Sequence, residues 1–290
     1  MAEQESAAIG RNSFKISFIR IGIRRRRLGE GGTALSAGLA DYHVHLLGHG
    51  EGKLSRDYLE EFVRQAQCQG LEELGLADHD DFLDQVRLLV SGPAREWVSS
   101  LPVRVGLEIS YRPERSGEIR RLAGAYRFDY LIGSVHDLDG WPFDHPDYID
   151  GYAGRDPDQL YRQYFSLVVE LARSGLFDVV GHLDLIKIFG CRCRKPVTEL
   201  ASAALTAVKE AGLVVEVNTA GLFKPVGEIY PGPELLQACY DLDLPITFGS
   251  DAHRPEEVGR SFSYAAERAR RVGYRRYVQW RERRRLLVPL

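Results

Sequence analysis

Short apolar runs recur along this chain, and they limit sharply the folds that it can adopt. Seven such runs lie between residues 39 and 249, each of the length of a buried strand. The predicted strands are 39–43, 73–77, 103–108, 130–134, 178–181, 214–218 and 245–249. Amphipathic helices are predicted between Ser55 and Gly70 and over 159–174, 198–211 and 233–240. Strands separated by helices form parallel sheets, so seven units predict an α/β fold closed into a (β/α)7 barrel.

Metal-binding residue types follow these strands at their carboxyl ends. The stretch "DYHVHLLGHGEG", residues 41–52, places His43, His45 and His49 at and after the first strand. The later strands lead into the remaining members of this set: His79, Glu108, His136, His182, Asp251 and His253. Because the carboxyl ends of parallel strands meet at one face of a barrel, we expect these side chains to lie together at that face.

The set contains seven of the eight histidines in the chain, and only His145 stands outside it. One histidine at a strand end is more often a hydrogen-bonded core or surface residue than a ligand, but accident accounts poorly for seven. Imidazole and carboxylate ligands without thiolates suit Zn²⁺, Mn²⁺ or Fe. Nine ligands are too many for one ion, so we expect two to three divalent metal ions. His43 and His45 would reach one ion, and His49 another.

Charge is distributed unevenly along the chain. Residues 1–40 and 260–290 carry net charges of +4 and +8, which leaves −15 for residues 41–259 out of the total of −3. An acidic body attracts cations and argues against a nucleic-acid partner. No run approaches the ~20 apolar residues of a membrane span, and four cysteines are too few for a disulfide framework, so we expect a cytoplasmic protein. Residues 1–38 predict a weakly ordered N-terminal extension to a barrel domain at 39–290.

Several longer stretches carry a family resemblance. They are "DYHVHLLGHGEG", "GLADHDDF", "GLEIS", "LIGSVHDLDGWPFD", "VVGHLDLIKIFG", "VEVNTAGLFKPVGEIYPGPELL" and "PITFGSDAHRPEEVG". In this order, over residues 41–259, the chain resembles the polymerase-and-histidinol-phosphatase (PHP) superfamily of metal-dependent phosphoesterases. The "GSDAH" and "GEIYP" segments are similar to those of its histidinol-phosphate phosphatases.

The resemblance implies a distorted seven-stranded TIM-like barrel with a trinuclear metal site at the carboxyl ends of its strands. The implied ligands form three groups: His43, His45 and Asp251 for one ion; Glu108, as a bridge, with His136 and His182 for a second; and His49, His79 and His253 for a third. In this arrangement we expect a hydroxide bridging two ions to attack phosphorus. Asp251 is predicted to be both a ligand and the catalytic proton acceptor.

Three further residues are predicted to contact the substrate. Lys187 and Lys224 lie just past the fifth and sixth strands, where each would either pair with phosphate or remain a solvated surface lysine. Asn218 ends the sixth strand, which carries no ligand, and is expected to orient the substrate. The phosphatases that this chain resembles commonly have a basic residue where this chain has Phe223.

Three functional hypotheses follow. The first is hydrolysis of a small-molecule phosphate ester, L-histidinol phosphate, to L-histidinol and phosphate in histidine biosynthesis. The second is a PHP phosphoesterase acting on another small phosphate or on a nucleotide or oligonucleotide end. A metal-dependent amidohydrolase is a weaker variant, because no strand end supplies the metal-bridging lysine of such barrels. The third is a metal-binding domain without catalytic activity, which the complete ligand set disfavours.

Overall fold

The computed structural model describes residues 38–91, 97 and 100–290. The extension predicted at 1–38 therefore lies outside the described residues, except for Gly38. The strands are β1 (Ala40–Val44), β2 (Glu73–Leu76), β3 (Val103–Val105), β4 (Leu107–Ser110), β5 (Leu131–Ser134), β6 (Val179–Val180), β7 (Val214–Asn218), β8 (Ile246–Gly249), β9 (Arg276–Arg281) and β10 (Arg284–Pro289). The α-helices are α1 (Arg56–Cys68), α2 (Leu83–Ser91), α3 (Ser116–Ala125), α4 (Pro157–Arg173), α5 (Val197–Ala211), α6 (Pro233–Asp241) and α7 (Phe262–Val272).

The parallel strands close into a distorted barrel, as predicted. They pair in two groups, β1-β2-β3 and β4-β5-β6-β7-β8. One junction between the groups is a parallel bridge between His79 and Glu108. At the other junction β1 meets β8, where Val44 bridges Ala252 and the His45 N–H donates to the Ala252 carbonyl at 2.8 Å. Every strand of the barrel thus points its carboxyl end toward the same face.

The strand predicted at 103–108 is divided, and in this detail the prediction is wrong. Gly106 separates β3 from β4, although its N–H still donates to the Leu76 carbonyl at 2.7 Å. A Cβ atom on Gly106 would lie 2.5 Å from the ring of Tyr130. Glycine is required here because the Tyr130 ring occupies the space that any side chain would need.

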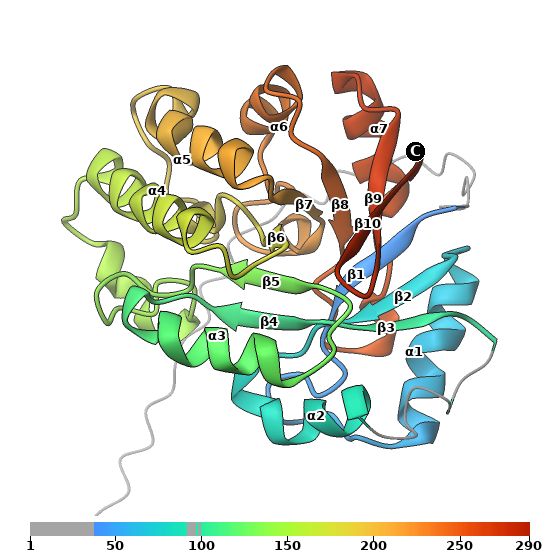
Figure 1. The fold of residues 1–290 in the computed structure, drawn as a ribbon. Coiled ribbons are helices and arrows are strands. Elements are labelled where there is room, and N and C mark those ends of the chain that lie inside the picture. Colours follow the sequence, from blue (N-terminus) through green and yellow to red (C-terminus); the bar gives the residue numbers. More distant parts are fainter. Residues whose placement is uncertain (1–37, 92–96, 98–99) are drawn as a thin grey trace, which may run out of the picture. The chain divides into compact units, whose positions relative to one another are not determined.

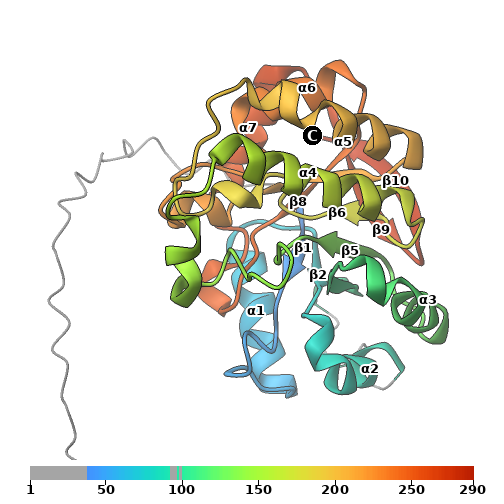
Figure 2. The ribbon, with the colours of Figure 1, turned by 90° about the vertical axis from the view of Figure 1, so that its left-hand side faces the viewer.

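Helices lie around the outside of the barrel, with α4 and α5 side by side (Figures 1 and 2). The hydroxyl of Ser55 accepts a hydrogen bond from the Tyr58 N–H at 3.3 Å and so caps α1, as predicted. The four predicted helices are confirmed as α1, α4, α5 and α6. Helices α2 and α3, each of which buries only two apolar side chains, were not predicted. Within the described residues, no helix is long and apolar enough to cross a membrane.

The arginine-rich carboxyl end forms helix α7 and then an antiparallel hairpin of β9 and β10. The sequence indicated only a solvated helix face and a terminal segment there, so the hairpin is an addition. It attaches to the amino-terminal end of the barrel, since the Tyr277 hydroxyl donates to the Gly38 carbonyl at 2.7 Å, just before β1. Likewise, the Thr247 hydroxyl of β8 donates to the Val278 carbonyl at 2.9 Å.

Trp280 of this hairpin closes the amino-terminal end of the barrel core. Its side chain is fully buried, and its ring stacks on that of Tyr130 with centroids 6.3 Å apart. Its backbone N–H donates to the Tyr42 hydroxyl at 3.0 Å. Aromatic side chains of this size contribute much of the free energy of a core. The end of the barrel opposite the predicted ligands is therefore sealed by packing.

We expect the Trp280→Ala variant to lower the free energy of unfolding by about 3–5 kcal/mol, because it leaves a large cavity in the core. Urea denaturation followed by circular dichroism measures this change. Leu287→Ala is the control, since Leu287 lies on the same hairpin and is 60% exposed. Equal stability of the two variants would contradict a closing role for Trp280.

Candidate metal centre

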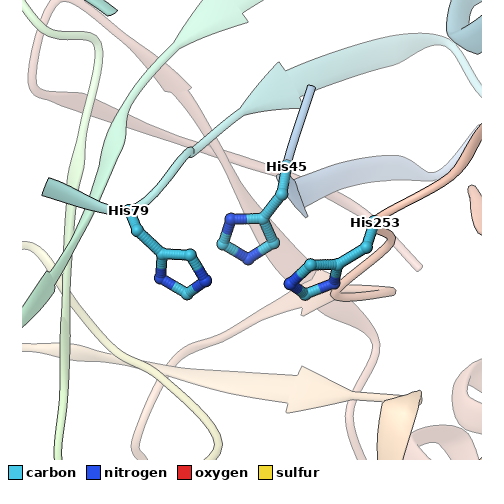
Figure 3. A group of neighbouring side chains, drawn as sticks. All are labelled: His45, His79 and His253. Carbon is cyan, nitrogen blue, oxygen red and sulfur yellow. The ribbon is translucent and has the colours of Figure 1, made fainter. Parts of the chain in front are cut away.

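The predicted ligands converge at the carboxyl-terminal face of the barrel. His45 follows β1, His79 follows β2 and His253 follows β8, and their imidazoles point toward one another (Figure 3). The ring of His45 lies 4.2 Å from that of His79 and 4.3 Å from that of His253, measured between centroids. Segments separated by more than 200 residues thus supply one cluster, because the barrel closes β1 against β8.

Four groups of side chains place their ligand atoms within 4.8 Å of one another. These groups are His43, His45 and Glu108; His43, His182 and Asp251; Glu108, His136 and His182; and His45, His79 and His253. They share members, so the side chains form one continuous cluster. Eight of the nine predicted ligands belong to these groups.

His49 is the ninth predicted ligand, and it lies beside the cluster. Its ring is 4.3 Å from that of His253 and 5.4 Å from that of His79, between centroids, although His49 itself is exposed. The structure groups His45, where the resemblance implied His49, with His79 and His253. A role for His49 as a ligand of this group stays a prediction.

Glu108 lies at the centre of the cluster and is 1% exposed. Its Oε1 is 3.0 Å from His182 Nε2 and 3.4 Å from His43 Nε2, and its Oε2 is 2.9 Å from His79 Nδ1. The Ser134 hydroxyl donates to the same carboxylate at 2.6 Å. Both carboxylate oxygens therefore face imidazoles, which is the arrangement that a bridging ligand requires.

Carboxylates and imidazoles of the cluster shift one another's pKa values. Burial opposes the ionisation of Glu108, but the His43 and His136 imidazoles outweigh it and hold the pKa of this carboxyl well below its usual range. Burial also opposes the ionisation of Asp251, and His43 and His45 again outweigh it, so the pKa of that carboxyl is also lowered. Burial holds the pKa of His45 well below its ordinary value. Burial also opposes the protonation of His43, but the carboxylates of Glu216 and Glu108 outweigh it and raise the pKa of that imidazole. Ionised carboxylates and neutral imidazoles are the forms that coordinate cations, so a cation that binds His43 would displace its proton.

Unpartnered nitrogens test whether these residues fit metal ions. Buried polar atoms almost always have hydrogen-bond partners. Among the described residues, several buried imidazole nitrogens have none: His43 Nε2, His45 Nδ1 and Nε2, His79 Nε2, His182 Nδ1 and His253 Nε2. Leaving them unpaired would be unfavourable in a folded core, and divalent cations would use their lone pairs. The donor set therefore fits metal ions.

Glu216 is a buried carboxylate that the sequence reasoning missed. It lies 2.6 Å from His43 Nδ1 and accepts the backbone N–H of His182 at 2.8 Å. A carboxylate on the second imidazole nitrogen fixes the tautomer and leaves Nε2 free for a metal. The available signal was an acid between Val215 and Val217 in a strand that is otherwise apolar up to Asn218.

The residues predicted to contact substrate lie in three different environments. Lys187 is 2% exposed, and its ammonium is 2.8 Å from Asp184 and 3.2 Å from Glu228. Asn218 is fully buried; its amide donates to Glu216 at 3.1 Å and its oxygen accepts the Ala220 N–H at 2.9 Å. The polar groups of both side chains are thus engaged within the protein, which favours structural roles.

Lys224 is exposed, and the neighbouring Phe223 is 55% exposed. The guanidinium carbon of Arg260 lies 4.3 Å from the centroid of the Phe223 ring, within the range of a cation–π contact. A basic group from another segment thus lies beside the position where the resemblance led us to expect one.

Comparison with known proteins agrees with this geometry. A family model described as "PHP domain" matches residues 41–220, and one described as "PHP-associated" matches residues 236–270. The first alone covers more than half of the chain. The chain belongs to the PHP family.

This PHP chain is similar to curated proteins over most of its length. It is 39% identical over 254 residues to a probable histidinol-phosphatase of Deinococcus radiodurans, an alignment that covers 82% of this chain and 95% of that protein. It is 29% identical over 269 residues to the histidinol-phosphatase of Bacillus subtilis, covering 79% of this chain and 98% of that protein.

Solved structures show the same fold. One is a histidinol phosphate phosphatase of Lactococcus lactis in complex with zinc, L-histidinol and phosphate, with a TM-score of 0.70, 20% identity and coverage of 86% of this chain and 99% of that one. Another is a putative histidinol phosphatase of Listeria monocytogenes, with a TM-score of 0.66, 21% identity and coverage of 78% and 99%. The predicted fold class is thereby confirmed.

We expect Glu216→Gln to weaken metal binding or activity by about 10- to 100-fold, the usual effect of losing a carboxylate behind a ligating histidine. The amide keeps the size of the side chain but removes the charge that orients His43. Metal titration by calorimetry and phosphate-release assays measure the effect. Glu210→Gln, at an exposed position on α5, is the control. Metal affinity and activity that both match wild type would contradict this role.

Proposed function

We propose that this PHP chain hydrolyses a small phosphomonoester and that its substrate is L-histidinol phosphate, which yields L-histidinol and phosphate. The observation that carries the proposal is the cluster of four overlapping ligand groups around Glu108 at one face of the barrel. Similarity to histidinol-phosphatases over about four-fifths of the chain supports the choice of substrate. So does the Lactococcus lactis structure of the same fold, which contains zinc, L-histidinol and phosphate.

The groups around Glu108 would hold two to three divalent ions of zinc, manganese or iron. The donor set of imidazoles and carboxylates suits these metals, and the unpartnered buried nitrogens could serve as ligands of such ions. When bound, divalent ions neutralise the charge of a phosphoryl group and make water a stronger nucleophile at neutral pH. Residues 41–259 carry a net charge of −15, and this negative charge helps to concentrate these cations.

The side chains of the protein prepare the site before substrate arrives. Glu216 holds the orientation of His43, and Ser134 holds that of Glu108. Asp251 Oδ1 lies 3.2 Å from His45 Nε2, and the Asp251 side chain is 18% exposed. Its ionised carboxylate is therefore available both as a ligand and as an acceptor for a proton or hydrogen bond of the attacking water, the role that we assign to it.

We expect Asp251→Asn to lower kcat by about 10²–10⁴-fold, because the amide can neither take up a proton nor ligate with a full negative charge. Phosphate release from L-histidinol phosphate is the measurement. Asp147→Asn is the matched control, since Asp147 is 84% exposed and lies outside the cluster. Near-normal turnover by Asp251→Asn would refute the assignment.

Removal of metal should abolish hydrolysis and lower the melting temperature, because ions that bind only the folded state stabilise it. Reconstitution with zinc, manganese or iron should restore both properties.

A panel of L-histidinol phosphate, other phosphomonoesters, mononucleotides and dinucleotides separates the hypotheses. L-histidinol phosphate should give the highest kcat/KM. A higher value for another ester would favour the second hypothesis, and metal-loaded protein inert on every ester would favour a domain without catalytic activity.

A further inference from the structure

Tyr230 carries a buried hydroxyl for which the protein provides no partner among the described residues. The side chain is 1% exposed, and its Oη has no hydrogen-bond partner. An unpaired buried hydroxyl is unfavourable, and such groups in native proteins normally contact water, an ion or a ligand. Six of the other unpaired buried atoms among the described residues are imidazole nitrogens of the proposed metal ligands, and the remaining ones include Asp184 Oδ1 and Thr219 Oγ1. The position of Tyr230 therefore decides what its hydroxyl serves.

Tyr230 lies against the metal centre. Its ring packs edge-on against the imidazole of His182, with centroids 6.3 Å apart. Its backbone N–H donates to the Asn218 carbonyl at 2.9 Å and its carbonyl accepts the Asn218 N–H at 2.6 Å, which ties it to the carboxyl end of β7. A tyrosine hydroxyl can donate one hydrogen bond as well as accept others.

The surroundings of Tyr230 hold its ring in one place. The Lys187 ammonium lies 5.2 Å from the ring centroid and donates to the Ile229 carbonyl at 2.9 Å. A Cβ atom on Gly221 would lie 2.8 Å from Cε2 of the ring, so glycine is needed for the close approach of this loop. A donor that is fixed before substrate arrives is worth more to a reaction than a mobile one, because it needs no reorganisation.

We propose that the Tyr230 hydroxyl is a catalytic hydrogen-bond donor to a phosphoryl oxygen of the bound ester. The inference rests on the proposed phosphatase function. It also changes the residue that we expect to contact phosphate. The ammonium of Lys187, predicted to make this contact, is paired with Asp184 and Glu228. The Tyr230 phenol beside it would donate a hydrogen bond to the phosphoryl group instead. A phosphoryl group offers only acceptor oxygens, so it matches a phenol that lacks an acceptor.

The test is Tyr230→Phe, which removes one oxygen and leaves the ring. We expect kcat/KM to fall by about 10²–10³-fold, as for other preorganised donors. The affinity of metal-loaded enzyme for inorganic phosphate, measured by calorimetry, should fall about tenfold. Metal content should match wild type, and the melting temperature should be unchanged or raised, because an unpaired buried hydroxyl has been removed.

Tyr161→Phe is the matched control. The Tyr161 hydroxyl is already used, since it donates to the Cys191 carbonyl at 2.8 Å. Its loss should lower the melting temperature and leave kcat/KM and phosphate affinity unchanged. The two tyrosines therefore predict opposite patterns of stability and activity.

Two results would overturn the proposal. One is a Tyr230→Phe enzyme with wild-type kcat/KM and wild-type phosphate affinity, which is the outcome if the hydroxyl contacts only water. The other is a joint fall of melting temperature, metal content and activity, which indicates a structural role. Phosphate affinity does not depend on which ester is hydrolysed. A wild-type enzyme inert on every ester would thus refute the proposed function, and the phosphate affinity of Tyr230→Phe would still support or overturn the role of Tyr230 as a donor to phosphate.

Discussion

The carboxylate of Glu108 is buried among imidazoles that come from four different strand ends of the barrel. An isolated charge at such a depth would be strongly unfavourable, so its neighbours must compensate it. The histidines do so, and each has to arrive from its own strand with the correct register. Closure of β1 against β8 and the bridge between His79 and Glu108 are the contacts that allow this convergence. The metal centre and the barrel therefore depend on the same geometry.

The two ends of the barrel have different physical roles. At the amino-terminal end, Trp280 stacks on Tyr130 and bonds to Tyr42, and apolar burial stabilises the fold. At the carboxyl-terminal end, polar atoms are concentrated, and several buried imidazole nitrogens have no hydrogen-bond partner among the described residues. Unpaired polar atoms at this end lower the stability of the folded protein, whereas bound cations and an anionic ester would provide partners for them. Separation of the two functions lets the polar site form without loss of the core.

Charged residues near the centre also divide between structure and chemistry. Lys187, Asp184 and Glu228 neutralise one another in the loops after β6 and β7, so these charges support the loops. Glu216 supports His43 in the same way. Tyr230 differs from Lys187 and Glu228, because its only side-chain polar atom has no hydrogen-bond partner among the described residues. From charge alone, Lys187 would be expected to contact the substrate.

Local patterns in the chain were sufficient to predict the alternating strands and helices, the barrel and the face on which the ligands gather. They were sufficient because apolar periodicity and strand-end histidines are properties of neighbouring residues. The hairpin at 276–289, the break at Gly106 and the pairing of Lys187 were not visible in this way, since each depends on contact with a distant segment. The same holds for Glu216, which resembles any acid in a strand until the fold places His43 within 2.6 Å of it. The candidate ligands can thus be recognised from neighbouring residues in the sequence, whereas the groups that orient their side chains are recognised only when the fold brings remote strands together.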